Sequence, residues 1–154
     1  MARMVDIGGK PAVERIAVAA GRIRLRAATV EAIRRKTVKK GDVLAAAQLA
    51  GIQAAKRTPD IVPLCHPVPL TSLAVELTLD ADGVSVRCEA RARYGTGVEM
   101  EALSGVAGAL LCVWDMVKYL EKERTGNYPA TAIEGIRVLR KVKGRPGARR
   151  RRKG

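Results

Sequence analysis

Several short polar strings in the chain contain the residue types that phosphate and acid–base chemistry requires. Lys39-Lys40-Gly41-Asp42 precedes a predicted helix, and Lys56-Arg57-Thr58 ends that helix. The free backbone N–H groups of a helix N-terminus attract an anion, and adjacent lysines strengthen this attraction. Taken alone, each string also has a simpler interpretation. The first fits a solvated helix start, and the second fits cations that complement the negative end of the helix dipole.

A stiff loop carries the only histidine. Residues 63–70 read PLCHPVPL, and proline restricts the backbone, so this loop loses little entropy when it is held in place. His66 in such a loop is suited to hydrogen bonding with a substrate or to proton transfer. Cys65 precedes it, but the chain has no second histidine to act as a base for this thiol. A nucleophilic role for Cys65 is therefore disfavoured.

Carboxylates occur near both ends of a long predicted helix. Glu99 and Glu101 enter this helix, where acids complement its dipole. Their spacing directs them to different sides, so we expect only one of them to face solvent. Asp115 and Lys118 lie three residues apart late in the helix and share a face. A carboxylate and an amine held together beside an apolar run suit proton transfer, although a surface ion pair explains the same spacing.

The elements that must position these side chains follow from hydrophobic periodicity and turn signals. We predict a strand at 14–25, helices at 27–36 and 41–57, hairpin strands at 75–80 and 84–93, a helix at 98–123 and a strand at 133–141. Asp42 is the expected N-cap of the second helix, and Asp82-Gly83 is the hairpin turn. Removal of one helix leaves the order βαββαβ. The predicted fold class is therefore α+β: a ferredoxin-like antiparallel sheet with helices packed on one face, plus an extra helix.

Composition limits the classes of protein that remain. The 154 residues suit one domain, 1–143, followed by a basic tail, 144–154, that we expect to be disordered and to contact polyanions only non-specifically. Of the net charge of +14, residues 137–154 contribute ten Lys or Arg and no acid, which leaves +4 on the remainder. The three cysteines and the single histidine give no disulfide framework and no metal-binding spacing. The N-terminus resembles no signal peptide, and the longest apolar run, 102–114, is short for a membrane span, so we expect a cytoplasmic protein.

Taken together and in this order, the strings resemble one family. KKGDV, GIQAAKRT, PLCHPVPL, TGVEMEAL and VWDMVK, with an early Met4-Val5-Asp6, are similar to the cyclic pyranopterin monophosphate synthases, also called molybdenum cofactor biosynthesis protein C. The resemblance extends from about residue 4 to residue 140. It implies a lyase that rearranges a cyclised guanosine triphosphate into cyclic pyranopterin monophosphate and releases pyrophosphate. It also implies a homohexamer, a trimer of dimers, with active sites at a subunit interface and no prosthetic group. Whether a divalent ion accompanies the triphosphate is left open.

The resemblance assigns roles to individual positions. It implies that Asp115 is catalytic with Lys118 as its partner, and that Lys40 acts as an acid or a phosphate ligand. Substrate-contacting positions implied by the family motifs, or suggested by charge, are Leu64, Cys65, His66, Met100, Glu101, Glu99, Lys56, Arg57, Arg15 and Lys141. Cations among them suit a triphosphate, and the acids suit the proton transfers of a ring rearrangement. We expect Cys65 to contribute packing rather than a covalent step.

Some positions depart from the family pattern. Residues 142–147 read VKGRPG where many relatives have a glycine-, serine- and lysine-rich segment, so Arg145 is only a substitute phosphate contact. Residues 121–134 form a longer connection, and Trp114 replaces a tyrosine. A nucleic-acid-binding module is the main alternative because of the basic charge, but aromatic residues are only 3% of the chain. A non-catalytic relative that serves as an assembly partner is a third interpretation.

Overall fold

The computed structural model describes residues 1–146. Its elements, in chain order, are β1 (Val13–Arg24), α1 (Ala27–Arg34), α2 (Val43–Lys56), α3 (Thr58–Ile61), β2 (Leu70–Leu79), β3 (Gly83–Tyr94), α4 (Glu99–Glu121) and β4 (Ala132–Lys143). Every predicted strand and helix is present, with ends that differ by a few residues. The prediction of a disordered basic tail falls mainly on residues 147–154, which lie outside the described part of the chain.

The four strands form one antiparallel sheet with the order β2-β3-β1-β4. This order is that of the split βαβ motif, so the predicted α+β, ferredoxin-like class is confirmed. The central strand β1 pairs with β3 without interruption, from Val13 opposite Tyr94 to Arg24 opposite Gly83. Its pairing with β4 contains two register shifts, between Val18 and Ala19 and between Ala20 and Arg22. The central strand is therefore regular on its β3 side and irregular on the side of the edge strand β4.

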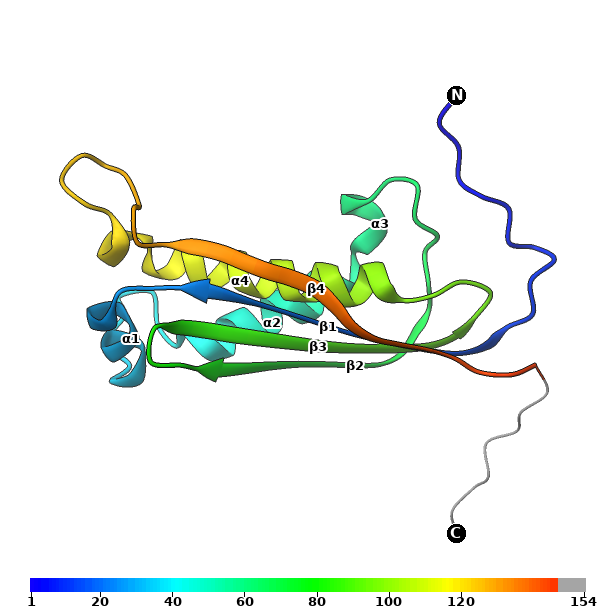
Figure 1. The fold of residues 1–154 in the computed structure, drawn as a ribbon, viewed down its shortest axis with the longest axis horizontal. Helices are drawn as coiled ribbons and strands as arrows, with labels where there is room; N and C mark the ends of the chain where they lie inside the picture. The colour runs from blue at the N-terminus through cyan, green and yellow to red at the C-terminus, as the bar shows by residue number, and fades with distance from the viewer. Residues whose placement is uncertain (147–154) are drawn as a thin grey trace, which may run out of the picture.

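The two long helices cover one face of the sheet (Figure 1), and the core lies between them and the inward side chains of β1 and β3. Small residues let the helices approach closely: a Cβ at Gly51 of α2 would lie 2.8 Å from the carbonyl oxygen of Gly105 of α4. By length and composition α4 could cross a membrane, but 56% of its apolar window is buried in the protein. α4 is thus the central core helix, and it extends from one end of the sheet to the other (Figure 1).

Two local features shape the chain around α2. Asp42 is the N-cap as expected, because its Oδ1 accepts a hydrogen bond from the backbone N–H of Ala45 at 3.2 Å. At the other end, Thr58–Ile61 were expected only to stop the helix, but they form the separate short helix α3. The Thr58 hydroxyl donates to the carbonyl oxygen of Ala55, and Pro59 occupies an early helical position that needs no N–H. α3 then leads into the proline-rich loop.

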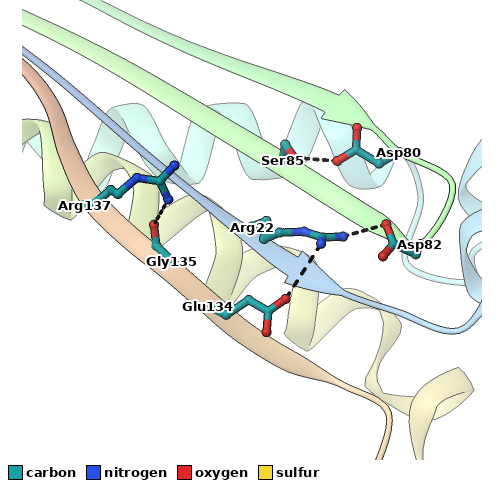
Figure 2. A network of polar contacts seen from close by, with 7 residues as sticks. All are labelled: Arg22, Asp80, Asp82, Ser85, Glu134, Gly135 and Arg137. Carbon is teal, nitrogen blue, oxygen red and sulfur yellow. Dashed lines mark hydrogen bonds and ion pairs between the residues drawn. The ribbon is translucent and has the colours of Figure 1, made fainter.

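The face of the sheet without helices carries a polar network (Figure 2). The Arg22 guanidinium of β1 lies 2.6 Å from Asp82 in the β2–β3 turn and 3.8 Å from Glu134 of β4. Ser85 donates a hydrogen bond to Asp80 beside it. These contacts link the turn and three strands, so they stabilise the sheet. A shallow cavity of about 320 Å³ on this face is lined by both acidic residues and arginines. The opposite charges do not favour either an anionic or a cationic ligand.

Candidate active site

Asp115 lies between two ammonium groups. Its Oδ2 is 2.6 Å from Lys40 Nζ, and its Oδ1 is 2.8 Å from Lys118 Nζ. Lys40 Nζ also donates to the backbone carbonyl oxygen of Asp115 at 3.0 Å. Lys118 comes from the same face of α4, three residues later, as predicted. Lys40 comes from the turn before α2, 75 residues away in sequence. The fold thus joins two of the polar strings identified in the sequence.

The charges of this cluster reinforce one another. Hydrogen bonds from Lys118 and then Lys40 lower the pKa of Asp115 to about 2, although the carboxylate is exposed to solvent. In return, the hydrogen bond and charge of Asp115 raise the pKa of Lys118 above its usual value. At neutral pH Asp115 is therefore ionised and Lys118 is protonated. Asp115 therefore helps to keep Lys118 charged and holds its ammonium group in place.

A second group of predicted residues lines one cavity of about 580 Å³ at the opposite end of α4. The proline-rich loop supplies one wall, the start of α4 a second, the end of β4 a third and the N-terminal segment a fourth. Predicted site residues that line it are Leu64, Cys65, His66, Glu99, Met100, Glu101 and Lys141. Both glutamates line this cavity. Glu101 is buried whereas the Glu99 side chain is 26% exposed, so the expectation that only one of them faces solvent is confirmed.

Glu99 is part of a charged link across the cavity. Lys141 Nζ pairs with Glu99 Oε1, so β4 and α4 are joined at this end. Burial raises the pKa of Glu99, but the hydrogen bond from Lys141 and the charges of Lys141 and Arg15 outweigh burial, and the net pKa is lowered. Arg15 is buried and donates to the backbone carbonyl oxygens of Tyr94 and Gly95 at 3.3 and 3.2 Å. Arg15 therefore supports this end of the site from β1.

Glu101 has the opposite electrostatic character. Only 3% of the residue is exposed. Burial, and then the charge of Glu99, raise the pKa of Glu101 above its usual value. Burial also raises the pKa of the Cys65 thiol, with a further contribution from Glu101. Cys65 therefore stays a neutral thiol, as expected for a packing residue. Glu101, next to an ionised Glu99, is suited to holding and releasing a proton.

The other predicted phosphate-binding cations, Lys56, Arg57 and Arg145, lie outside this cavity. Lys56 lines a neighbouring cavity that also contains Glu101, Pro67 and Tyr94. Arg57 is exposed at the end of α2 and lines neither the cavity of the second group nor the neighbouring cavity of Lys56. Arg145 is exposed beyond the end of β4. The structure therefore places Lys56 close to the second group and brings neither arginine into it.

The two groups do not meet within one chain. Glu101 and Asp115 are 14 residues apart on α4, which corresponds to about 21 Å along the helix axis. One group thus lies at the start of this helix and the other near its end. The N-terminal segment adds two cations to the Glu101 end, Arg3 and Lys10, which the sequence reasoning missed. Only their closeness to the motif Met4-Val5-Asp6 could have indicated them. Within residues 1–146 no three His, Cys, Asp or Glu side chains gather as a metal site would require.

Comparisons with known proteins agree on one family. Residues 4–144 match the MoaC family. A protein of Archaeoglobus fulgidus named "Probable cyclic pyranopterin monophosphate synthase" is 56% identical over 142 residues, which cover 92% of this chain and 91% of that protein. A Thermococcus kodakarensis protein of the same name is similar to the same extent. A Methanothermobacter thermautotrophicus protein, 55% identical over 92% of this chain and 89% of its own length, is named "Probable cyclic pyranopterin monophosphate synthase accessory protein".

Proposed function

Because the chain belongs to the MoaC family, we propose that it is a cyclic pyranopterin monophosphate synthase that acts in molybdenum cofactor biosynthesis. Its substrate is (8S)-3',8-cyclo-7,8-dihydroguanosine 5'-triphosphate, and its products are cyclic pyranopterin monophosphate and pyrophosphate. The observation that carries this proposal is the ionised Asp115 between Lys40 and Lys118. This cluster offers two cations held by one carboxylate.

The two groups of residues suit the two demands of this reaction. Release of pyrophosphate needs cations that stabilise the charge moving onto the leaving oxygens, and Lys40, Lys118 and Lys141 are such cations. Ring opening and closure need several proton transfers. Glu101, with its raised pKa, and His66, between prolines, line the same cavity and suit this role.

Each complete site is formed by two subunits. One subunit contributes the Lys40–Asp115–Lys118 cluster, and another contributes the cavity with His66 and Glu101. The spacing of about 21 Å along α4 supports this arrangement, because a single substrate does not span the two groups along the helix of one chain. The assembly is a homohexamer, a trimer of dimers, in the cytoplasm, and the enzyme requires no prosthetic group. Closed symmetry gives every subunit both roles.

The direct test is incubation of the purified protein with the cyclised nucleotide, followed by measurement of pyrophosphate and of the pterin product. Asp115→Asn keeps the size of the side chain but removes the charge that orients both lysines. This variant should lose at least about a hundredfold in turnover, the scale expected when groups that stabilise transition-state charge lose their orientation. Full turnover by Asp115→Asn would remove the assigned role.

The shared site has its own test. Asp115→Asn and Glu101→Gln, each inactive alone, are mixed, dissociated and reassembled. If the site spans two subunits, random pairing gives about a quarter of sites with neither substitution, and activity returns to that fraction. A mixture of Asp115→Asn with Lys118→Ala is the matched control, because both substitutions fall in the same half-site. If neither mixture regains activity although subunits exchange, the site lies within one chain.

A further inference from the structure

Tyr119 contacts the segment that carries Lys40, and the sequence motifs do not identify this tyrosine. It follows Asp115 by four residues on α4, so both side chains occupy one face of the helix. The Tyr119 hydroxyl oxygen accepts a hydrogen bond from the backbone N–H of Lys39 at 2.9 Å. Lys39 Nζ also lies 5.4 Å from the centre of the Tyr119 ring, within the range of a cation–π contact. Tyr119 therefore contacts both the backbone and the side chain of Lys39.

The held segment is a tight turn with Lys39 and Lys40 at its centre. The backbone N–H of Gly41 donates to the carbonyl oxygen of Val38 at 3.0 Å, and Val38 is buried. Lys40 reaches Asp115 across a half-exposed surface with a long, flexible side chain. Such a side chain loses considerable rotamer entropy when it is fixed, so its contact depends on where its backbone is held. The hydroxyl of Tyr119 holds the adjacent residue.

We propose that Tyr119 is a positioning residue, whose hydroxyl fixes the Lys39–Lys40 turn so that Lys40 meets Asp115. α4 then presents both the carboxylate that Lys40 contacts and the hydroxyl that sets the position of Lys40. The effect on the Lys40–Asp115 contact is independent of the reaction. The effect on turnover rests on the proposed function.

The effect of Tyr119 on the Lys40–Asp115 contact is tested by titrating Asp115, with its side-chain carboxyl ¹³C signal as the readout. Charged and titratable groups near Asp115 are Lys40 from the turn, Lys118 and Cys112 from α4, and Tyr128, which lies near Lys118. Lys40→Ala should raise the pKa of Asp115, while Lys118 keeps it below 3.8. Tyr119→Phe keeps the ring and removes the hydroxyl, and it should shift the pKa of Asp115 towards the Lys40→Ala value. A titration identical to the wild type would overturn the proposal.

A second pair of variants removes the other partner of the hydrogen bond. Lys39→Pro removes the donating N–H, and proline is favoured at this second position of a turn. Lys39→Ala removes the ammonium group but keeps the N–H. Lys39→Pro should reproduce the shift of Tyr119→Phe, and Lys39→Ala should not. Thr37→Val is the matched control, because it deletes a different hydroxyl hydrogen bond, to Ala32, from the same loop. Equal titrations in Lys39→Pro and Lys39→Ala would also overturn the proposal.

The same variants have a catalytic readout. Loss of one neutral hydrogen bond should lower kcat by about fivefold in Tyr119→Phe, with little change in KM and no change in the pH at which activity peaks. Unchanged kcat in both Tyr119→Phe and Lys39→Pro would refute the catalytic part of the proposal. If the wild-type protein forms no product, the proposed function fails, whereas the titration of Asp115 still decides the role of Tyr119.

Discussion

Replacement of Glu101 by glutamine should make the protein more stable at neutral pH while it removes activity. Glu101 is 3% exposed, and its pKa is raised by burial and by Glu99. The unfolded chain ionises this group near 4.5, whereas the folded protein resists ionisation until higher pH. Above the folded pKa, the folded state therefore carries a penalty of about 1.4 kcal/mol for each unit by which the pKa is raised. Glutamine carries no charge and avoids this penalty.

The pH dependence of the difference identifies its cause. Below about pH 4, Glu101 is protonated in both folded and unfolded states, so wild type and Glu101→Gln should have similar free energies of unfolding. As the pH rises through the folded pKa of Glu101, the wild type loses stability and the variant does not. The variant should then be more stable than the wild type at pH 8, by a difference that is absent or much smaller at pH 4. Other titrating groups are common to both proteins and cancel in the difference.

The assay is urea unfolding at pH 4 and pH 8, at one protein concentration for both proteins because subunit association contributes to stability. Turnover of the cyclised nucleotide is measured on the same samples, and Glu101→Gln should lose at least about a hundredfold. Glu76→Gln, at an exposed position on β2, is the matched control and should change neither quantity appreciably. If Glu101→Gln is less stable than the wild type at pH 8, burial of the Glu101 charge is not destabilising. If the difference in free energy of unfolding is the same at pH 4 and pH 8, ionisation of Glu101 is not its cause.

Three further substitutions have defined outcomes. Cys65→Ala should keep turnover within about threefold of the wild type, because the raised pKa of Cys65 leaves a neutral thiol. Loss of all activity in the kinetic assay would mean that the sulfur takes part in the reaction. Lys40→Ala should raise the pKa of Asp115 by less than about one unit, because the hydrogen bond from Lys118 lowers this pKa more than the one from Lys40 does. A larger rise in an NMR titration would mean that Lys40 has the larger effect. Glu121→Ala leaves the part-buried backbone N–H of Arg26 and the buried hydroxyl of Thr131 without their acceptor. The free energy of unfolding, measured by heat or urea, should fall by about 3 kcal/mol. A fall below about 0.5 kcal/mol would show that neither hydrogen bond matters for stability.

Local patterns were sufficient to predict the fold. Alternating residues on both sides of Asp82-Gly83 predicted the hairpin, and the Asp42 cap predicted the start of α2, because both signals act within a few residues. The short helix α3 was missed, since Thr58-Pro59-Asp60 fits a helix end and a helix start equally well. The sheet order was inferred only through the similarity of the element order to a known motif.

The candidate site was predicted less completely, because its contacts join distant parts of the chain. The Asp115–Lys118 pair follows from helical spacing, but the contact of Lys40 with Asp115 depends on how α2 packs on α4. The closeness of Glu99 to Lys141 depends likewise on where β4 ends. The position of Arg3 beside this cavity follows from the path of the N-terminal segment, which no periodicity encodes.

The stoichiometry of a single reaction decides whether the protein is a synthase. The purified protein is incubated with the cyclised nucleotide, and pyrophosphate and pterin product are quantified together. The wild type should release one pyrophosphate for each pterin formed, and Asp115→Asn should form almost none of either product. The opposite result is intact substrate after incubation with folded wild-type protein, together with tight, salt-sensitive RNA binding by residues 1–146. It would exclude the synthase and favour a nucleic-acid-binding module.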